Sequence, residues 1–239
     1  MRVDHAHRHG RPTSLPAARA LCLALLAAAM AGGAGRVHAA AQPPSLRRPD
    51  QVKELAAGKV LVSARGLPDP NFAETVILLL EYDGDHALGL IVNRPTEVPL
   101  SRVFPQLMQP RGQTPRVYFG GPVQVEGALA LARAARAPAD AHRVFGDVYL
   151  INSRERLEAA VKADSGSTRL RVYLGYAGWG RGQLEMETSQ GAWHVFPADA
   201  GSVYDPEPES LWPRQIHRAE ERVLLASDVA SNPVLTPGR

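Results

Sequence analysis

Cysteine is almost absent from this chain of 239 residues, and its histidines are few and scattered. The one cysteine is Cys22, so the chain beyond residue 40 has no disulfide, no thiol nucleophile and no thiolate ligand. No GxSxG sequence that would place a catalytic serine is present either. The histidines beyond residue 40 stand apart from one another and form no HxH or HExxH spacing: His86, His142, His194 and His217. We therefore expect no metal site, no cofactor and no familiar nucleophilic machinery.

An excess of charge is also missing once the first forty residues are set apart. The whole chain holds 27 basic and 24 acidic residues, a formal net charge of +3. Residues 1–40 contribute five of the arginines and one aspartate, so the remainder holds 22 basic and 23 acidic residues. A chain this close to neutrality lacks the basic surface typical of proteins that bind nucleic acid. Nucleic acid is therefore not expected among its partners.

The first forty residues follow the pattern of a secretory signal peptide. Arginines precede a short apolar run at 20–31, and small residues follow, with A-x-A-like cleavage sites that end at Ala39 and Ala41. The run is shorter than the about 20 residues that a membrane-spanning helix needs. The pattern predicts export to the periplasm, removal of residues 1–40 and no stable membrane span afterwards. The alternative is translation from Met30, which would leave the protein in the cytoplasm.

The rest of the chain is predicted to hold one domain, at residues 55–226. Residues 41–54 are expected to be a linker and residues 227–239 a flexible tail. Apolar runs predict strands at 59–64, 75–82, 87–93, 116–119, 127–131, 148–151, 170–173 and 193–196. Helices are expected after Ser153, after Gly182 and, as a short last segment, from Asp205 to Trp212. Strands in neighbouring pairs with few helices between them indicate an α+β fold.

Two neighbouring strands can be placed more closely. Residues 75–82 are apolar almost without interruption, which is typical of a central strand buried on both faces. Asp83-Gly84 follows, a pair that favours a tight turn, so residues 87–93 are expected to return antiparallel to the first strand.

The most distinctive stretch runs from Tyr173 to Glu185 and holds four glycines in thirteen residues. Such glycines allow close approach to the backbone, and Tyr176 and Trp179 add large flat rings beside Gly178. One interpretation is a ligand- or partner-binding surface, which extends to Gln183 and Glu185 at the start of the following helix. The alternative is structural: the rings belong to the core, and the acid interacts with the helix dipole.

Three further motifs supply candidate binding residues, each with a structural alternative. Asp69-Pro-Asn71-Phe contains turn-forming residues, and Asn93-Arg94-Pro ends a strand where asparagine tolerates a left-handed conformation. Gly120-Gly121-Pro follows a strand as a phosphate-binding loop does, but lacks the lysine and helix of such a loop. The candidate ligand-binding residues are therefore Asp69, Asn71, Asn93, Arg94, Gly120, Gly121, Tyr176, Gly178, Trp179, Gln183 and Glu185.

In this order and spacing, these motifs resemble the YqgE/AlgH family of bacterial proteins over about residues 55–216. The resemblance implies a single α+β domain with a curved, mostly antiparallel or mixed, partly barrel-like sheet surrounded by short helices. It implies little about function, because the family is mostly uncharacterised and offers no catalytic residues to transfer. Some members carry a label as transcriptional regulators of exopolysaccharide production. Members usually lack an export signal, so that label transfers poorly to an exported chain.

Three hypotheses about function remain open. The first is a non-catalytic protein of the bacterial envelope that binds an unknown protein or small molecule. The second is a hydrolase or transferase that uses Asp69, Asn93 and Glu185, because polar groups at strand ends often form active sites. The third is a cytoplasmic transcriptional regulator, which depends on translation from Met30.

Overall fold

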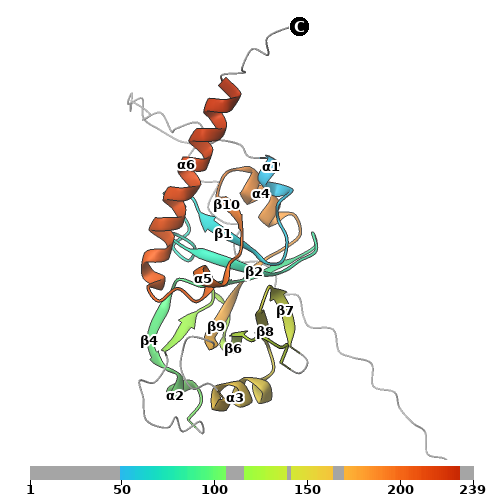
Figure 1. Cartoon of the computed structure of the whole chain (residues 1–239), viewed down its shortest axis with the longest axis vertical. Helices are drawn as coiled ribbons and strands as arrows, with labels where there is room; N and C mark the ends of the chain where they lie inside the picture. The colour runs from blue at the N-terminus through green and yellow to red at the C-terminus, as the bar shows by residue number, and fades with distance from the viewer. Residues whose placement is uncertain (1–48, 106–115, 139–140, 164–169, 232–239) are drawn as a thin grey trace, which may run out of the picture. The chain divides into compact units, whose positions relative to one another are not determined.

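The computed structural model describes residues 49–105, 116–138, 141–163 and 170–231 (Figure 1). They all belong to the second of two compact units of the chain, Pro43–Arg239. The predicted signal peptide at 1–40 lies outside the described residues. In the parts of the chain that are described, no helix is long and apolar enough to span a bilayer.

The strands of the described residues form one curled sheet, and most neighbours in it are antiparallel. Its order is β10-β1-β2-β3-β9-β6-β8-β7, with β4 paired to β5 and β5 parallel to β9. The ten strands are β1 Lys59–Ser63, β2 Val76–Tyr82, β3 Ala87–Ile91, β4 Pro95–Pro99, β5 Arg116–Phe119, β6 Val123–Arg133, β7 His142–Phe145, β8 Val148–Ile151, β9 Leu170–Trp179 and β10 Trp193–Pro197. This arrangement confirms the predicted α+β fold with a curved, largely antiparallel sheet.

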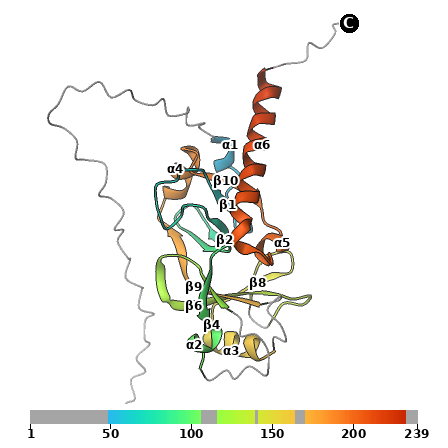
Figure 2. The ribbon, with the colours of Figure 1, turned by 90° about the vertical axis from the view of Figure 1, so that its left-hand side faces the viewer.

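The helices of the described residues are short, with one exception. They are α1 Pro49–Val52, α2 Leu100–Val103, α3 Arg154–Ala163, α4 Gln183–Ser189, α5 Ala200–Val203, the 3₁₀ turn η1 Pro208–Ser210 and α6 Leu211–Ser231. Figures 1 and 2 show α6 beside β1 and β10, with its C-terminal half continuing past the sheet.

Strand β2 is buried on both faces, as its apolar run predicts. Leu78 packs into one apolar cluster together with residues of α6, whereas Ile77 and Leu79 pack into a second cluster on the opposite face. The predicted turn between β2 and β3 also forms: the Asp83 carboxylate accepts hydrogen bonds from the backbone N–H groups of Asp85 and His86, at 3.0 and 2.9 Å. The local pattern was therefore sufficient for this hairpin.

The ends of the domain differ from the sequence expectation. The predicted linker at 41–54 includes α1, whose Gln51 side chain accepts a hydrogen bond from the N–H of Val195 on edge strand β10. The last helix is long rather than short and continues to Ser231, into the segment expected to be a tail. Its first half is held by Trp212, Ile216 and Ala219, which lie along one face and are buried against the sheet.

Candidate functional site

Arg94 joins two of the sequence motifs into one structure. The turn at Asp69 is held locally, because the Asp69 carboxylate accepts a hydrogen bond from the N–H of Asn71 at 2.8 Å. From its place between β3 and β4, the Arg94 guanidinium donates to the carbonyl oxygens of Asn71 and Ala73, both at 2.7 Å. It also donates to that of Pro70 at 3.4 Å. Arg94 therefore holds a turn more than twenty residues away in sequence.

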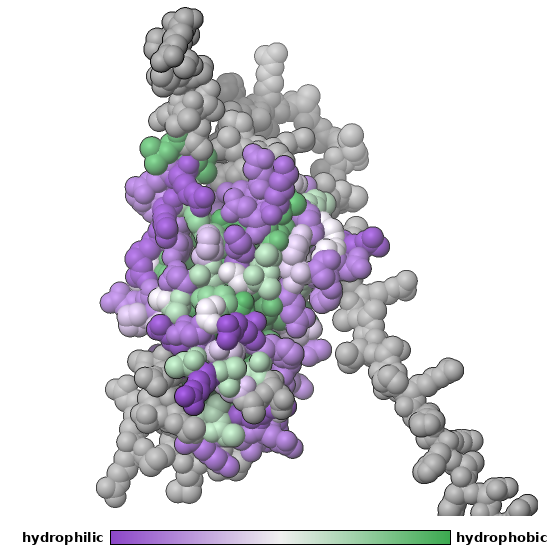
Figure 3. Space-filling model, turned by 45° about the vertical axis from the view of Figure 1, so that its right-hand side comes forward, coloured by the Kyte–Doolittle hydropathy of each residue, from purple (hydrophilic) through white to green (hydrophobic). Residues whose placement is uncertain are grey.

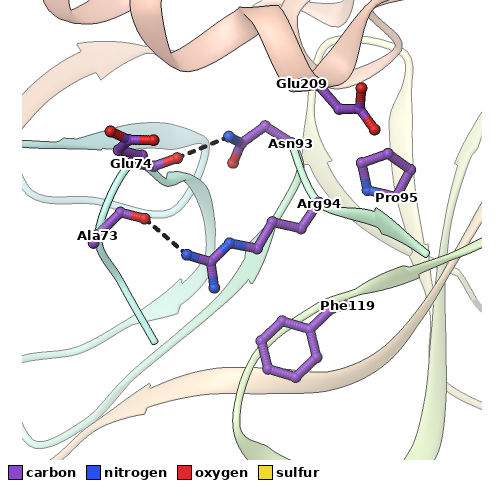
Figure 4. A pocket seen from close by; sticks show the side chains of 7 residues that line it. All are labelled: Ala73, Glu74, Asn93, Arg94, Pro95, Phe119 and Glu209. Carbon is purple, nitrogen blue, oxygen red and sulfur yellow. Dashed lines mark hydrogen bonds between the residues drawn. The ribbon is translucent and has the colours of Figure 1, made fainter. Parts of the chain in front are cut away.

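Asn93 completes the same structure from inside the fold. Its side chain is only 5% exposed. The side-chain oxygen accepts a hydrogen bond from the N–H of Val76 at 2.8 Å, and the side-chain nitrogen donates to the carbonyl of Glu74 at 3.0 Å (Figure 4). Glu74 has a φ of 57°, unusual for a residue with a side chain. Asn93 thus forms hydrogen bonds with the backbone groups of Glu74 and Val76, where the chain enters β2.

Gly120 and Gly121 are required by a close backbone crossing. A β-carbon on Gly120 would lie 2.3 Å from the carbonyl oxygen of Gly175, and one on Gly121 would lie 2.2 Å from the carbonyl carbon of Tyr176. Gly121 also has a φ of 152°. The N–H of Gly120 donates to the carbonyl of Leu174 at 2.8 Å, so the two segments are bonded where they cross. This geometry places both glycines in a structural role.

Trp179 lies in the core and forms part of an indole clamp, which we define as Trp179, Trp193, Glu187 and Gln183. The two tryptophans are 4% and 1% exposed. Both of their indole N–H groups donate to one oxygen of the Glu187 carboxylate, at 3.0 and 2.8 Å. Its other oxygen accepts from the Gln183 side chain at 2.9 Å. The structural alternative therefore holds for Trp179, whose ring offers no surface to a ligand.

The remaining candidates lie around this core. Glu185 accepts a hydrogen bond from the Tyr82 hydroxyl at 2.7 Å, and burial together with this bond raises the pKa of Tyr82 to about 12. Tyr176 is half-buried against the cluster on the α6 side of the sheet. Gly178 is exposed, and a β-carbon there would lie 3.3 Å from the Tyr176 ring. These residues support β9 and α4 rather than a common cleft.

The candidate residues are therefore brought together, but mainly to bond one another's segments. Phe72, from the turn that Arg94 holds, stacks on Trp179 with ring centroids 6.0 Å apart and 20° between the planes. The N–H of Phe119, next to Gly120, donates to the carbonyl of Arg94 at 2.9 Å. The turn, the glycine crossing and the indole clamp are thus contiguous parts of one structural network.

An open pocket of about 400 Å³ lies beside Arg94. Figure 4 shows Glu74 and Glu209 on either side of Arg94, with Phe119 below. Among the described residues, neither glutamate carboxylate forms a hydrogen bond or an ion pair, although the charge of Glu74 acts on the guanidinium groups of Arg94 and Arg65. Burial lowers the pKa of the Arg94 guanidinium, while the charges of Glu74 and Asp69 oppose that shift. The pocket is lined by Ala73, Glu74, Asn93, Arg94, Pro95, Phe119 and Glu209.

Sequence reasoning missed three residues that the structure makes important: Glu187, Glu209 and Phe119. Glu187 stands four residues after Gln183, but nothing in the sequence indicated that it meets two tryptophans. Glu209 belongs to η1 and comes to the pocket from a distant part of the chain.

As for metal ions, no cluster of three or more possible ligand residues is found within the described ranges.

Comparison with known proteins gives a consistent assignment. The family model described as AlgH-like (DUF179) matches residues 60–223. A UPF0301 protein of Streptomyces avermitilis is 37% identical over 184 residues, which are 74% of this chain and 94% of that protein. A UPF0301 protein of Methylococcus capsulatus is 38% identical over 164 residues, which are 66% of this chain and 86% of that protein.

Two solved structures share the fold. The solution structure of the AlgH protein from Pseudomonas aeruginosa has a TM-score of 0.58 and 30% sequence identity, and the match covers 77% of this chain and 95% of that one. A crystal structure of a protein from Corynebacterium diphtheriae has a TM-score of 0.57 and 25% identity, with coverage of 69% and 87%. The descriptions of these proteins name no reaction and no ligand.

Proposed function

The chain belongs to the AlgH-like family, and from this premise we propose that it is a non-catalytic binding protein of the bacterial envelope. Its binding site in this proposal is the pocket beside Arg94. One observation carries the proposal: the motif residues that could perform chemistry are bonded within the fold, whereas the carboxylates of Glu74 and Glu209 are unpaired among the described residues.

The hypothesis of a hydrolase or transferase loses its motivation for the same reason. Asp69 bonds its own turn, Asn93 bonds the backbone at Val76 and Glu74, and Glu185 bonds Tyr82. A catalytic pair would need side chains directed at one common substrate atom. These three side chains serve three different structural contacts.

The pocket suggests the chemical class of its ligand. Two unpaired carboxylates flank it, and the Arg94 guanidinium is already engaged with carbonyl oxygens of the neighbouring turn. Phe119 and Pro95 add apolar surface. A cationic group on an apolar stem fits this combination, as in an arginine side chain of a partner protein. Figure 3 shows one face of the surface, on which hydrophilic residues predominate and apolar patches lie between them.

A titration followed by NMR tests the pocket. Two small probes are compared, both with blocked, uncharged backbone ends. N-acetylarginine amide carries a cationic side chain, and N-acetylcitrulline amide is its neutral counterpart of similar shape. We expect the arginine probe to shift the amide signals near Glu74, Phe119 and Glu209. The double variant Glu74→Gln/Glu209→Gln should bind it about tenfold more weakly, because two attractive charges are lost.

The matched control is Glu126→Gln, which removes an exposed charge elsewhere, on β6. It should leave the affinity unchanged. Equal binding of the arginine and citrulline probes, or shifts confined to other parts of the chain, would contradict the proposed site.

The compartment is tested separately, by determining the N-terminus of the native protein in cell fractions. Cleavage at the A-x-A-like sites predicts a periplasmic protein that begins at Ala40 or Gln42. A cytoplasmic protein that begins at Met30 would contradict export. It would also make the regulator hypothesis possible again, and retention on DNA at physiological salt would then be its test.

A further inference from the structure

A buried arginine lies at the centre of a tyrosine cluster on the α6 side of the sheet, and none of the cluster residues lines the pocket. We name Arg171, Tyr118, Tyr173 and Tyr204 the tyrosine cluster. Arg171, on β9, is 8% exposed. Its guanidinium carbon lies 4.7 Å from the ring centroid of Tyr118 and 5.8 Å from that of Tyr204. The ring centroids of Tyr118 and Tyr173 are 5.3 Å apart.

The charge of Arg171 has no carboxylate partner among the described residues. Its guanidinium donates to the carbonyl oxygens of Val203, at 2.8 Å, and Asp205. The carboxylate of Asp205 is used by Arg214 and by the N–H of Glu207. Carbonyl oxygens and aromatic faces compensate a buried guanidinium only in part, because a buried charge is stabilised mainly by an opposite charge.

Two hydroxyl donors of the tyrosine cluster are also unpaired. The hydroxyl groups of Tyr173 and Tyr204 each expose less than 1 Å² and donate to no acceptor among the described residues. The Arg171 guanidinium lies within hydrogen-bonding reach of the Tyr173 oxygen, so at Tyr173 it is the O–H donor that lacks a partner. Tyr173 as a whole is 0% exposed. Burial raises the pKa of both tyrosines, and the charge of Arg171 opposes that shift. The carboxylate of Asp147, itself paired with Arg133, adds to the rise at Tyr204. Both hydroxyls are therefore protonated at neutral pH and available as donors.

We propose that the tyrosine cluster binds a small inorganic anion of about the size of chloride. The cluster presents a positive charge that only carbonyl oxygens and aromatic rings accompany, and two hydroxyl donors with no acceptor among the described residues. Unpaired buried donors are rare in native proteins and indicate a missing partner. Water would satisfy the hydroxyls but would leave the charge of Arg171 uncompensated, whereas an anion satisfies both.

The size of the anion follows from burial. Both hydroxyl oxygens are closed off from solvent, and the rings of the cluster pack against each other and against Arg171. Such a site suits a monatomic anion better than phosphate or a larger carboxylate. This inference is independent of the proposed function, because it involves none of the residues that line the pocket.

The anion is tested by thermal unfolding of the purified protein in sodium chloride and in sodium gluconate of equal ionic strength. Gluconate is too large to enter. A ligand at about ten times its Kd raises the Tm of a domain of this size by about 3 °C. We therefore expect the Tm in chloride to be higher than the Tm in gluconate by about that amount. The double variant Tyr173→Phe/Tyr204→Phe should fold, since the lost hydroxyl donors are unpaired, and should show no difference between the salts.

The matched control is Tyr149→Phe, which removes a hydroxyl that accepts a hydrogen bond from Arg143 outside the cluster. It should keep the full chloride effect. Crystals soaked in sodium bromide give a direct readout, because bromide is located by its anomalous scattering. Bromide beside Arg171 supports the proposal. An absent chloride effect, an effect that the double variant retains, or a water in place of bromide would overturn it.

Discussion

Replacement of Glu187 by leucine tests whether the glycine- and aromatic-rich stretch is a structural clamp. One carboxylate oxygen of Glu187 accepts both indole N–H groups, and both rings are buried. Leucine leaves the two donors without a partner in an apolar environment. An orphaned buried donor costs about 1–3 kcal/mol, so the loss in free energy of unfolding should be about 4 kcal/mol. The Gln183 side chain also loses its acceptor, but it is only half-buried and can turn towards water.

The assay is equilibrium unfolding in urea, followed by tryptophan fluorescence and by circular dichroism. With a denaturant slope of about 2 kcal/mol/M, the midpoint should fall by about 2 M. Two of the three tryptophans belong to the indole clamp, so their emission should also change in the folded state.

The isosteric variant Glu187→Gln separates loss of the acceptor from loss of the charge. Its amide oxygen can still accept both indole N–H groups, so it should cost only about 1 kcal/mol. The control Glu185→Gln removes a charge from the same helix and keeps an acceptor for Tyr82. A midpoint of Glu187→Leu within about 0.5 M of the wild-type value would refute the structural interpretation of this motif.

Three further predictions follow from the network around Arg94 and β9. Asn93→Ala removes the partners of Val76 N–H and of the Glu74 carbonyl, and urea unfolding should show a loss of about 2 kcal/mol. Gly120→Ala places a β-carbon 2.3 Å from the Gly175 carbonyl oxygen, so we expect a loss of about 3 kcal/mol or a failure to fold, seen as insoluble protein. The raised pKa of Tyr82 stabilises the fold fully below pH 10, and this contribution is lost as the pH rises to about 12. The stability of Tyr82→Phe should therefore decline less than that of the wild type over this range, and equal declines in both would contradict the assignment.

Much of the fold could be predicted because the relevant signals are local. The apolar run of β2 indicated a strand buried on both faces, and Asp83-Gly84 indicated the turn to β3. The helix after the glycine-rich stretch was predicted correctly, but the strand before it was predicted to end at residue 173, whereas β9 continues through Gly175 and Gly178 to Trp179. The last helix was predicted to end at Trp212, but α6 continues to Ser231, and its buried residues Trp212, Ile216 and Ala219 have helical spacing. A proline in the first helical turn, such as Pro213, does not interrupt a helix.

The site depended on contacts between segments that are distant along the chain. The sequence by itself determined the order of the strands and turns, the motifs and the family, because these depend on neighbouring residues and on likeness to relatives. Only the tertiary structure decided that Arg94 holds the turn at Asp69, that Gly120 crosses Gly175, and that Glu187 meets two indoles. A partner twenty or more residues away, as for Arg94 and Gly120, leaves no trace in local periodicity, since it is set by how the sheet curls. Glu187 is only six and eight residues from the two indoles, but they lie on two different strands whose approach local periodicity does not indicate.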